Sequence, residues 1–228
     1  MPFVLDRIRP QWPQRRFLRK FLGRLSVDCV LDVGANAGQY AEELRMIGYE
    51  GTIISFEPDP EVFSRLEKKS SRDRKWHALN IALGKEAGTA KLNVMAVSEF
   101  NSFRQPSESE TATFHTSNQV LRSVEVEMQT LDALLPRLSA SHGFSRPFLK
   151  LDTQGFDLEV FHGASEVRSQ IVGLQSELPI KKLYEGVPSW SEALGEYERG
   201  GFELAGLYQV NPGSDELIEL DCYFVRRS

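Results

Sequence analysis

A short apolar strand followed by a glycine turn is the first feature that could do chemistry. The strand begins at Val30, contains Asp32 and ends in the turn Gly34-Ala-Asn-Ala-Gly38. Gly34 allows a sharp backbone turn, and Gly38 lets a ligand or a neighbouring strand approach the next helix closely. This spacing differs from the Gly-x-Gly-x-x-Gly pattern that holds a diphosphate. Asp32 would repel a phosphate and attract a cationic amine or sulfonium.

A second carboxylate ends the next strand, Thr52 to Phe56. Glu57 follows that strand directly, at a position where it can accept hydrogen bonds from both hydroxyls of a ribose. Asp59 precedes Pro60 and is expected to cap the following helix. The two strand ends therefore predict a pocket for a positively charged nucleoside without phosphate, a description that S-adenosylmethionine fits.

A third group of candidates lies beyond the middle of the chain. Asp152 closes the apolar strand Phe148 to Leu151, at the edge where open α/β sheets bind ligands. It is the first candidate for orienting or deprotonating an acceptor, and the alternative is a plain helix cap. Lys150 lies on the same strand face, where it would pair with Asp152 or donate to an acceptor oxygen. Glu177 ends the next strand and would face the same space.

These carboxylates also raise the question of a metal. Asp152 and Glu177 are hard oxygen ligands that would suit magnesium or calcium if they converged. Two carboxylates at strand ends are common without a metal, so no metal site is expected.

The elements that must position these residues follow an alternating pattern from Asp28 onward. Short β-branched runs alternate with helical spacing, which indicates βα units on a parallel sheet. We expect strands near 28–33, 52–57, 75–80, 147–152, 171–177, 202–210 and 217–226, and helices near 37–47, 59–70, 157–169 and 189–200. The turn Asn211-Pro-Gly-Ser214 joins the last two strands, which should be antiparallel.

A long insertion, at about 88–140, separates the third and fourth parallel strands. It should contain a strand at 88–97, a half-buried strand around Val124 to Met128 and a short helix from Leu131 to Leu138, broken at Pro136. The polar stretch between Asn101 and Asn118 is either a plain loop or a lid that orders on substrate.

Residues 1–27 form a separate basic arm ahead of the domain at 28–228. Residues 1–24 carry seven Lys and Arg against one Asp, whereas the whole chain of 228 residues has a net charge of −5. At helical spacing, Phe17, Leu18, Phe21, Leu22 and Leu25 share one side, and the basic residues share the other. We expect this amphipathic helix to pack on the domain, with contact to a membrane surface or capping of the substrate as the alternatives.

Composition restricts the remaining choices. With 41% apolar and 26% charged residues the chain can bury a full core. Cys29 and Cys222 lie within strand-like runs and are interpreted as reduced thiols, which favours a cytoplasmic protein. The sequence has neither a signal-type apolar segment nor a run of about 18 apolar residues, so a membrane span is not expected. The acidic body makes a nucleic acid an unlikely partner.

Taken in order, the segments DVGANAGQY, FEPDP, NIALGKEAGTAKL, VEMQTLDALL and LKLDTQGFDLEVFHGA resemble the FkbM-type S-adenosylmethionine-dependent methyltransferases. The resemblance implies an α/β, class I Rossmann-like methyltransferase fold, with a mostly parallel seven-stranded sheet and an antiparallel last strand. It also implies methyl transfer to a hydroxyl of a small molecule, such as a sugar, glycoside or polyketide-like metabolite. The cofactor positions carried over by the resemblance are Asp32, Gly34, Asn36, Gly38, Tyr40, Glu57, Asn80, Ile81 and Ala82.

The fourth-strand segment departs from the family pattern Lys-x-Asp-x-Glu-Gly-x-Glu. Gln154 and Asp157 stand where that pattern has glutamates. This departure leaves open a catalytically inactive nucleoside-binding module, and the type of sheet leaves open a nicotinamide-dependent oxidoreductase. The second requires a glycine turn that cradles phosphates, which the spacing of Gly34 and Gly38 does not provide.

Overall fold

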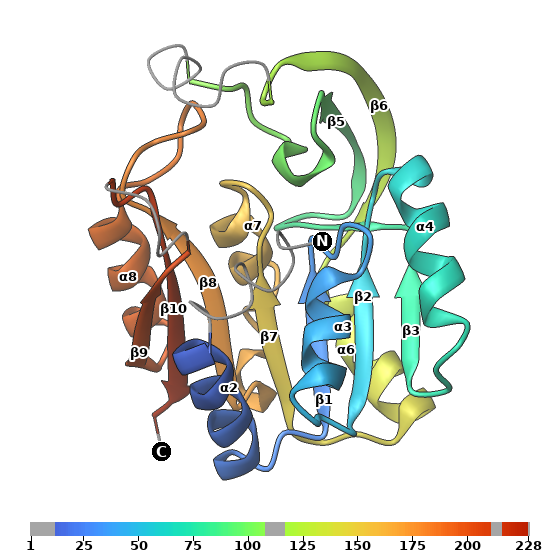
Figure 1. Ribbon diagram of the computed structural model, residues 1–228, viewed down its shortest axis with the longest axis vertical. Coiled ribbons are helices and arrows are strands. Elements are labelled where there is room, and N and C mark those ends of the chain that lie inside the picture. Colours follow the sequence, from blue (N-terminus) through green and yellow to red (C-terminus); the bar gives the residue numbers. More distant parts are fainter. Residues whose placement is uncertain (1–11, 108–116, 211–215, 228) are drawn as a thin grey trace, which may run out of the picture.

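Seven strands form one mixed sheet in the order β3-β2-β1-β7-β8-β10-β9 (Figure 1). The structure, a computed structural model, describes residues 12–107, 117–210 and 216–227. The strands of this sheet are β1 (Cys29–Val33), β2 (Thr52–Phe56), β3 (Trp76–Leu79), β7 (Pro147–Leu151), β8 (Gly173–Pro179), β9 (Phe202–Gln209) and β10 (Glu219–Arg226). β10 runs antiparallel to both of its neighbours, as the sequence predicts for the last strand.

Helices cover both faces of the sheet and bury its apolar residues. The helices are α2 (Trp12–Arg24), α3 (Gln39–Met46), α4 (Pro60–Ser70), α6 (Leu131–His142), α7 (Asp157–His162) and α8 (Trp190–Arg199). On one face Val30, Ile53 and Phe148 pack against α2, α3 and α4. On the other face, alternate residues of the same strands, such as Leu31 and Leu149, pack against α6, α7 and α8. The result is the three-layer arrangement of a doubly wound fold.

The insertion forms a second, three-stranded sheet above the carboxyl ends of the parallel strands (Figure 1). It consists of β4 (Ala82–Leu83), β5 (Gly88–Met95) and β6 (Val120–Gln129), with β6 in the middle. Both strands predicted in the insertion are therefore present, and β6 is longer than expected. Of the predicted loop or lid, residues 108–116 lie outside the described part of the chain.

A row of buried polar residues crosses the main sheet near its carboxyl edge. Strand register places side by side Ser55, Asp32, Lys150, Gln175 and Tyr223, one from each of five neighbouring strands. Each has at most 5% of its surface exposed. Because side chains alternate along a strand, all five lie on the face covered by α2 and α3. The row forms a polar layer directly under the edge where ligands bind in such folds.

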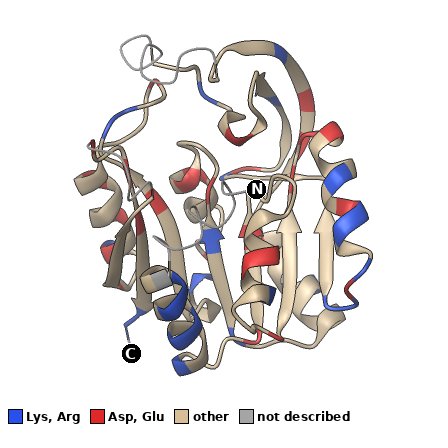
Figure 2. Cartoon of the chain, in the orientation of Figure 1, with Lys and Arg blue, Asp and Glu red and all other residues tan. Residues whose placement is uncertain are grey.

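The N-terminal helix α2 packs on the domain through the predicted apolar stripe. Leu18, Phe21 and Leu22 are buried, and the ring of Phe17 packs at an angle against Tyr208 and edge-on against Tyr223 of the sheet. The opposite side is rich in Lys and Arg, visible as blue on α2 in Figure 2. Contact of this basic side with a membrane surface stays a prediction, and the described helices include none that is long and apolar enough to span a membrane.

Two details of the predicted helices are wrong. The helix expected at 157–169 ends at His162. The next residue, Gly163, lies so close to Gly84 that a Cβ atom on Gly163 would be 2.0 Å from the carbonyl oxygen of Gly84. The helix expected to break at Pro136 continues to His142, because its buried Leu131 and Leu135 anchor it on the core. The turn Asn211 to Ser214 lies outside the described residues.

Candidate active site

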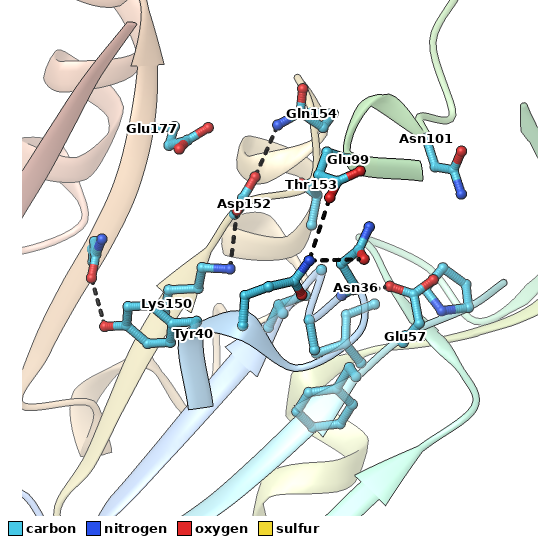
Figure 3. Close-up of a pocket in the computed structure, with 18 of the residues that line it drawn as sticks. Asn36, Tyr40, Glu57, Glu99, Asn101, Lys150, Asp152, Thr153, Gln154 and Glu177 are labelled. Carbon is cyan, nitrogen blue, oxygen red and sulfur yellow. Dashed lines mark hydrogen bonds and ion pairs between the residues drawn. The ribbon is translucent and has the colours of Figure 1, made fainter. Parts of the chain in front are cut away.

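A cavity of about 540 Å³ opens at the carboxyl edge of the main sheet, beneath the insertion. One end, called here the glycine end, is lined by residues that include Gly34, Asn36, Glu57, Ile81 and Ala82. The other, called here the carboxylate end, is lined by residues that include Lys150, Asp152, Glu177, Glu219 and Asp221. Figure 3 shows labelled residues from both ends around one space. The volume is within the range of small-molecule sites.

The glycine end is shaped by backbone in the left-handed region, which favours glycine. Gly34 has φ +76°, and a Cβ there would lie 1.9 Å from the carbonyl oxygen of Asp152. The first and fourth parallel strands therefore meet in direct backbone contact at the base of the cavity. Asn36 also adopts a positive φ, and its side-chain oxygen accepts from the N–H of Ala37 at 2.6 Å.

Glu57 is held in place by two backbone donors. Its Oε2 accepts from the N–H of Asn36 at 2.9 Å, and its Oε1 accepts from the N–H of Asp59 at 2.8 Å. Burial raises the pKa of Glu57 to about 7, although both backbone hydrogen bonds oppose this. Each carboxylate oxygen keeps a further lone pair, so the group can still accept hydrogen bonds from a ligand.

Six of the nine predicted cofactor-binding residues line the cavity, namely Gly34, Asn36, Tyr40, Glu57, Ile81 and Ala82. The other three are not among its described lining residues. Asp32 is fully buried and bound by Ser55, Gly38 faces the ring of Trp76, and Asn80 donates to the backbone oxygen of Glu57. A Cβ at Gly38 would lie 2.7 Å from the ring of Trp76, so the glycine makes room for this side chain of β3.

At the carboxylate end, Asp152 is held from two sides. Lys150 Nζ lies 3.2 Å from its Oδ2, and Gln154 Nε2 donates to its Oδ1 at 2.9 Å (Figure 3). Lys150 Nζ also lies 3.2 Å from Oδ1 of Asp32. Pairing with carboxylates, the simpler of its two predicted roles, is therefore the one in the structure.

Lys150 stays charged although it is buried. Burial alone would lower the pKa of its ammonium, but Asp152, Asp32 and Glu177 together raise it above the usual range. The ammonium also lies 5.1 Å from the ring centroid of Tyr40. A permanent cation at this point balances the buried charge of Asp32 and part of the negative charge of the cavity.

Several site residues were missed by the sequence analysis. Gln14, Gln175, Glu219, Asp221 and Tyr223 also line the carboxylate end. Gln14 comes from α2 and donates to Asp221 at 2.6 Å, while Gln175 donates to Asp221 at 2.8 Å. For the residues on strands, the sequence signal that could have revealed them was a polar residue at the same position in each apolar strand. The sequence holds no such signal for Gln14, because the N-terminal helix can be placed over the sheet only from the fold.

Residues of the insertion bind the loop after β7, beside the cavity. Ser102 donates to the backbone oxygen of Gln154 at 2.7 Å, and Arg104 donates to that of Gly155 at 2.6 Å. Tyr184 donates to the side-chain oxygen of Gln154 at 2.9 Å. Gln154, which departs from the family pattern, is therefore a junction between Asp152, the insertion and the segment after β8.

Among the residues that the structure describes, no group of three or more His, Cys, Asp or Glu side chains could hold a metal ion. Asp152 and Glu177 both line the cavity, but Asp152 is already held by Lys150 and Gln154.

A family model described as the methyltransferase FkbM domain matches residues 32–198 of the chain. No curated protein matches its sequence.

Among solved structures, the chain is similar to magnesium protoporphyrin IX methyltransferase from Synechocystis PCC 6803 with bound SAM. Identity is 12%, TM-score 0.53, and the match covers 99% of this chain and 85% of that one. A putative S-adenosylmethionine-dependent methyltransferase from Listeria monocytogenes has 7% identity and TM-score 0.51, over 96% and 99% of the two chains. A putative methyltransferase from Thermobifida fusca YX has 12% identity and TM-score 0.51, over 97% and 81%. These likenesses show the fold, a class I methyltransferase architecture.

Proposed function

Because this chain belongs to the FkbM methyltransferase family, we propose that it transfers a methyl group from S-adenosylmethionine to a hydroxyl of a small molecule. The observation that carries the proposal is the single cavity in which the glycine end and Asp152 face one space. An acceptor bound beside Asp152 would lie next to a ligand held at the glycine end. A sugar, glycoside or polyketide-like scaffold is the class of acceptor that we favour.

The residues present fit S-adenosylmethionine better than a dinucleotide. Among the described residues that line the cavity, Lys150 is the one Lys or Arg, and both Asp32 and Asp152 already pair with it. Seven carboxylic residues line the same space, namely Glu43, Glu57, Glu99, Asp152, Glu177, Glu219 and Asp221. Such a lining favours a cationic ligand and opposes phosphates.

Glu57 would hold the ribose, while Gly34 and Asn36 would border the amino-acid part of the cofactor. When bound, S-adenosylmethionine supplies a methyl group that its sulfonium has already activated. The main task of the protein is then to align the acceptor oxygen, since orientation alone can supply roughly 7–11 kcal/mol of a barrier.

Asp152 is our candidate for orienting the acceptor hydroxyl and accepting its proton. About a third of its side chain, 31%, is exposed, and its position between Lys150 and Gln154 fixes both carboxylate oxygens. The ammonium of Lys150 would stabilise the negative charge of Asp152. A positioned base contributes about 10²–10⁴-fold to a rate, so its loss should reduce activity without abolishing it.

The location that we favour is a reducing compartment such as the cytoplasm. Cys29 and Cys222 are both buried free thiols. Burial raises the pKa of Cys29 and of Cys222, which keeps both in the unreactive thiol form.

Calorimetry of the purified protein with S-adenosylmethionine, S-adenosylhomocysteine and NAD tests the proposal. We expect the two sulfur nucleosides to bind in the micromolar range and NAD not to bind. Mass spectrometry of reactions with glycosides and polyketides then identifies the acceptor. Binding of NAD alone would contradict the proposal, and so would binding of S-adenosylmethionine without methylation of any hydroxyl acceptor.

A further inference from the structure

Two carboxylates at the carboxylate end and one just behind it have hydrogen-bond donors of their own. Asp152 is bound by Lys150 and Gln154. Asp221 accepts from Gln14 and Gln175, and Asp157, just behind the cavity, accepts from Thr153 and from Ser176 at 2.7 Å. These groups are satisfied within the protein, so they need no ligand.

Glu177 and Glu219 are different. Within residues 12–107, 117–210 and 216–227, no side chain or backbone group donates a hydrogen bond to either carboxyl. Both line the main cavity, and both also line a small cavity of about 20 Å³ beside it, together with Asp152 and Tyr184. In Figure 3 the Glu177 carboxylate is drawn without any dashed line and points into the space in front of Asp152.

Two ionised carboxyls without hydrogen-bond donors destabilise the protein at this end of the cavity, unless a positive group compensates their charge. Burial, followed by Asp152 and Asp221, raises the pKa of Glu219 to about 8, and burial with Asp152 and Glu219 raises that of Glu177 well above its usual range. Lys150 partly offsets the shift at Glu177, but its ammonium is already shared by Asp32 and Asp152. A positive group brought by a ligand would supply the missing charge.

We propose that Glu177 and Glu219 bind an ammonium group of the methyl acceptor, which makes the acceptor a hydroxylated amine such as an amino sugar or an aminocyclitol. This inference rests on the proposed function, because it places the acceptor at the carboxylate end. The two carboxyls come from neighbouring strands, β8 and β10, and would hold the amine while Asp152 faces the hydroxyl.

The pairing has a consequence that can be measured in solution. At pH 7 a carboxyl with a pKa of about 8 is mostly protonated, and a bound ammonium ion would ionise it. The amine therefore binds with release of protons to the buffer, whereas a neutral polyol does not. The titratable and charged groups that face this pair from the surrounding elements are Lys150, Asp152, Asp157, Tyr184 and Asp221.

The test uses protein saturated with S-adenosylhomocysteine and two matched probes, 2-deoxystreptamine, which carries amines, and myo-inositol, which does not. We expect calorimetry at pH 7 to give a dissociation constant at least about tenfold lower for the amine. Buffers of different ionisation enthalpy should report proton release for the amine alone. Glu177→Gln and Glu219→Gln should each remove the preference, and Glu125→Gln, at an exposed site on β6, should keep it.

The outcomes separate this inference from the proposed function. Equal affinity for the two probes, or no binding of either while S-adenosylhomocysteine binds, would overturn the inference alone. A loss of S-adenosylhomocysteine affinity in folded Glu177→Gln and Glu219→Gln protein would also overturn it, since the carboxyls would then belong to the cofactor. If the wild-type protein does not bind S-adenosylhomocysteine, the proposed function fails as well.

Discussion

The side-chain amide of Gln154 donates to Oδ1 of Asp152 at 2.9 Å, at a position where the family resemblance implies a glutamate. A glutamate there would offer a second anion instead of a donor. Gln154 reaches Asp152 because its backbone adopts φ +52°, and Tyr184 holds the far side of its amide.

Gln154→Glu should therefore lower turnover at pH 7 by about tenfold. The new carboxylate would repel Asp152 instead of donating a hydrogen bond to it, so the carboxyl of Asp152 would no longer be fixed in position. Steady-state measurements of kcat and KM test this loss. Gln105→Glu, at an exposed position of the insertion, adds the same charge away from Asp152 and should leave both values unchanged.

Asp152→Asn should reduce kcat by about 10²-fold or more, while binding of S-adenosylhomocysteine changes little. The substitution keeps the shape of the side chain and removes its charge. Single-turnover assays and calorimetry on the same preparation separate the two effects. Full activity in this variant would exclude Asp152 as the proton acceptor.

Glu57→Gln should weaken S-adenosylhomocysteine binding by about 10- to 100-fold, because hydrogen bonds to a charged group contribute about 1.5–3 kcal/mol. Calorimetry gives the affinity, and circular dichroism checks that the fold is kept. Glu67→Gln, at an exposed position on α4, is the matched control. Unchanged affinity in Glu57→Gln would argue against a ribose contact.

Gly34→Ala and Gly48→Ala separate backbone strain from close contact. Both glycines have a positive φ, but a Cβ at Gly48 meets nothing within 4 Å, whereas one at Gly34 lies 1.9 Å from Asp152. Gly48→Ala should cost about 1–2 kcal/mol of the free energy of unfolding. Gly34→Ala should cost clearly more and also weaken cofactor binding, as urea unfolding and calorimetry will show. Equal costs would mean that the two strands can separate freely.

The free energy of unfolding should fall as the pH rises from about 5 to about 8. Between the usual pKa of 4.5 and the folded value of about 8, Glu219 keeps a proton that the unfolded chain has lost. Glu57, with a pKa of about 7, acts in the same direction. Urea unfolding at several pH values should show a smaller slope for Glu219→Gln than for the wild type. A slope as steep as in Glu125→Gln would contradict the shift.

The strands and the glycine end followed from the sequence because local patterns determine them. Asp32, Gly34 and Glu57 stand at strand ends, and the apolar run before each one predicts its place. The antiparallel pair of β9 and β10 followed in the same way.

The carboxylate end required information that no single segment carries. Glu219 and Asp221 lie at the start of a reversed strand, so only the sheet order brings them beside Glu177. Gln14 reaches the cavity only because α2 packs on Tyr208 and Tyr223 through Phe17. Pro136 misled the prediction because packing of Leu131 and Leu135 outweighs one lost helical hydrogen bond.

Because β10 runs in the reverse direction, its first residues, Glu219 and Asp221, lie at the same edge of the sheet as Glu177. The residues assigned to the cofactor all precede residue 84, and those that would meet the acceptor lie almost entirely between 150 and 223. Changes in the second segment can alter which molecule is methylated while the first continues to bind the methyl donor. The fold is therefore suited to hybrid enzymes, in which the carboxyl-terminal strands of one relative are grafted onto the donor half of another.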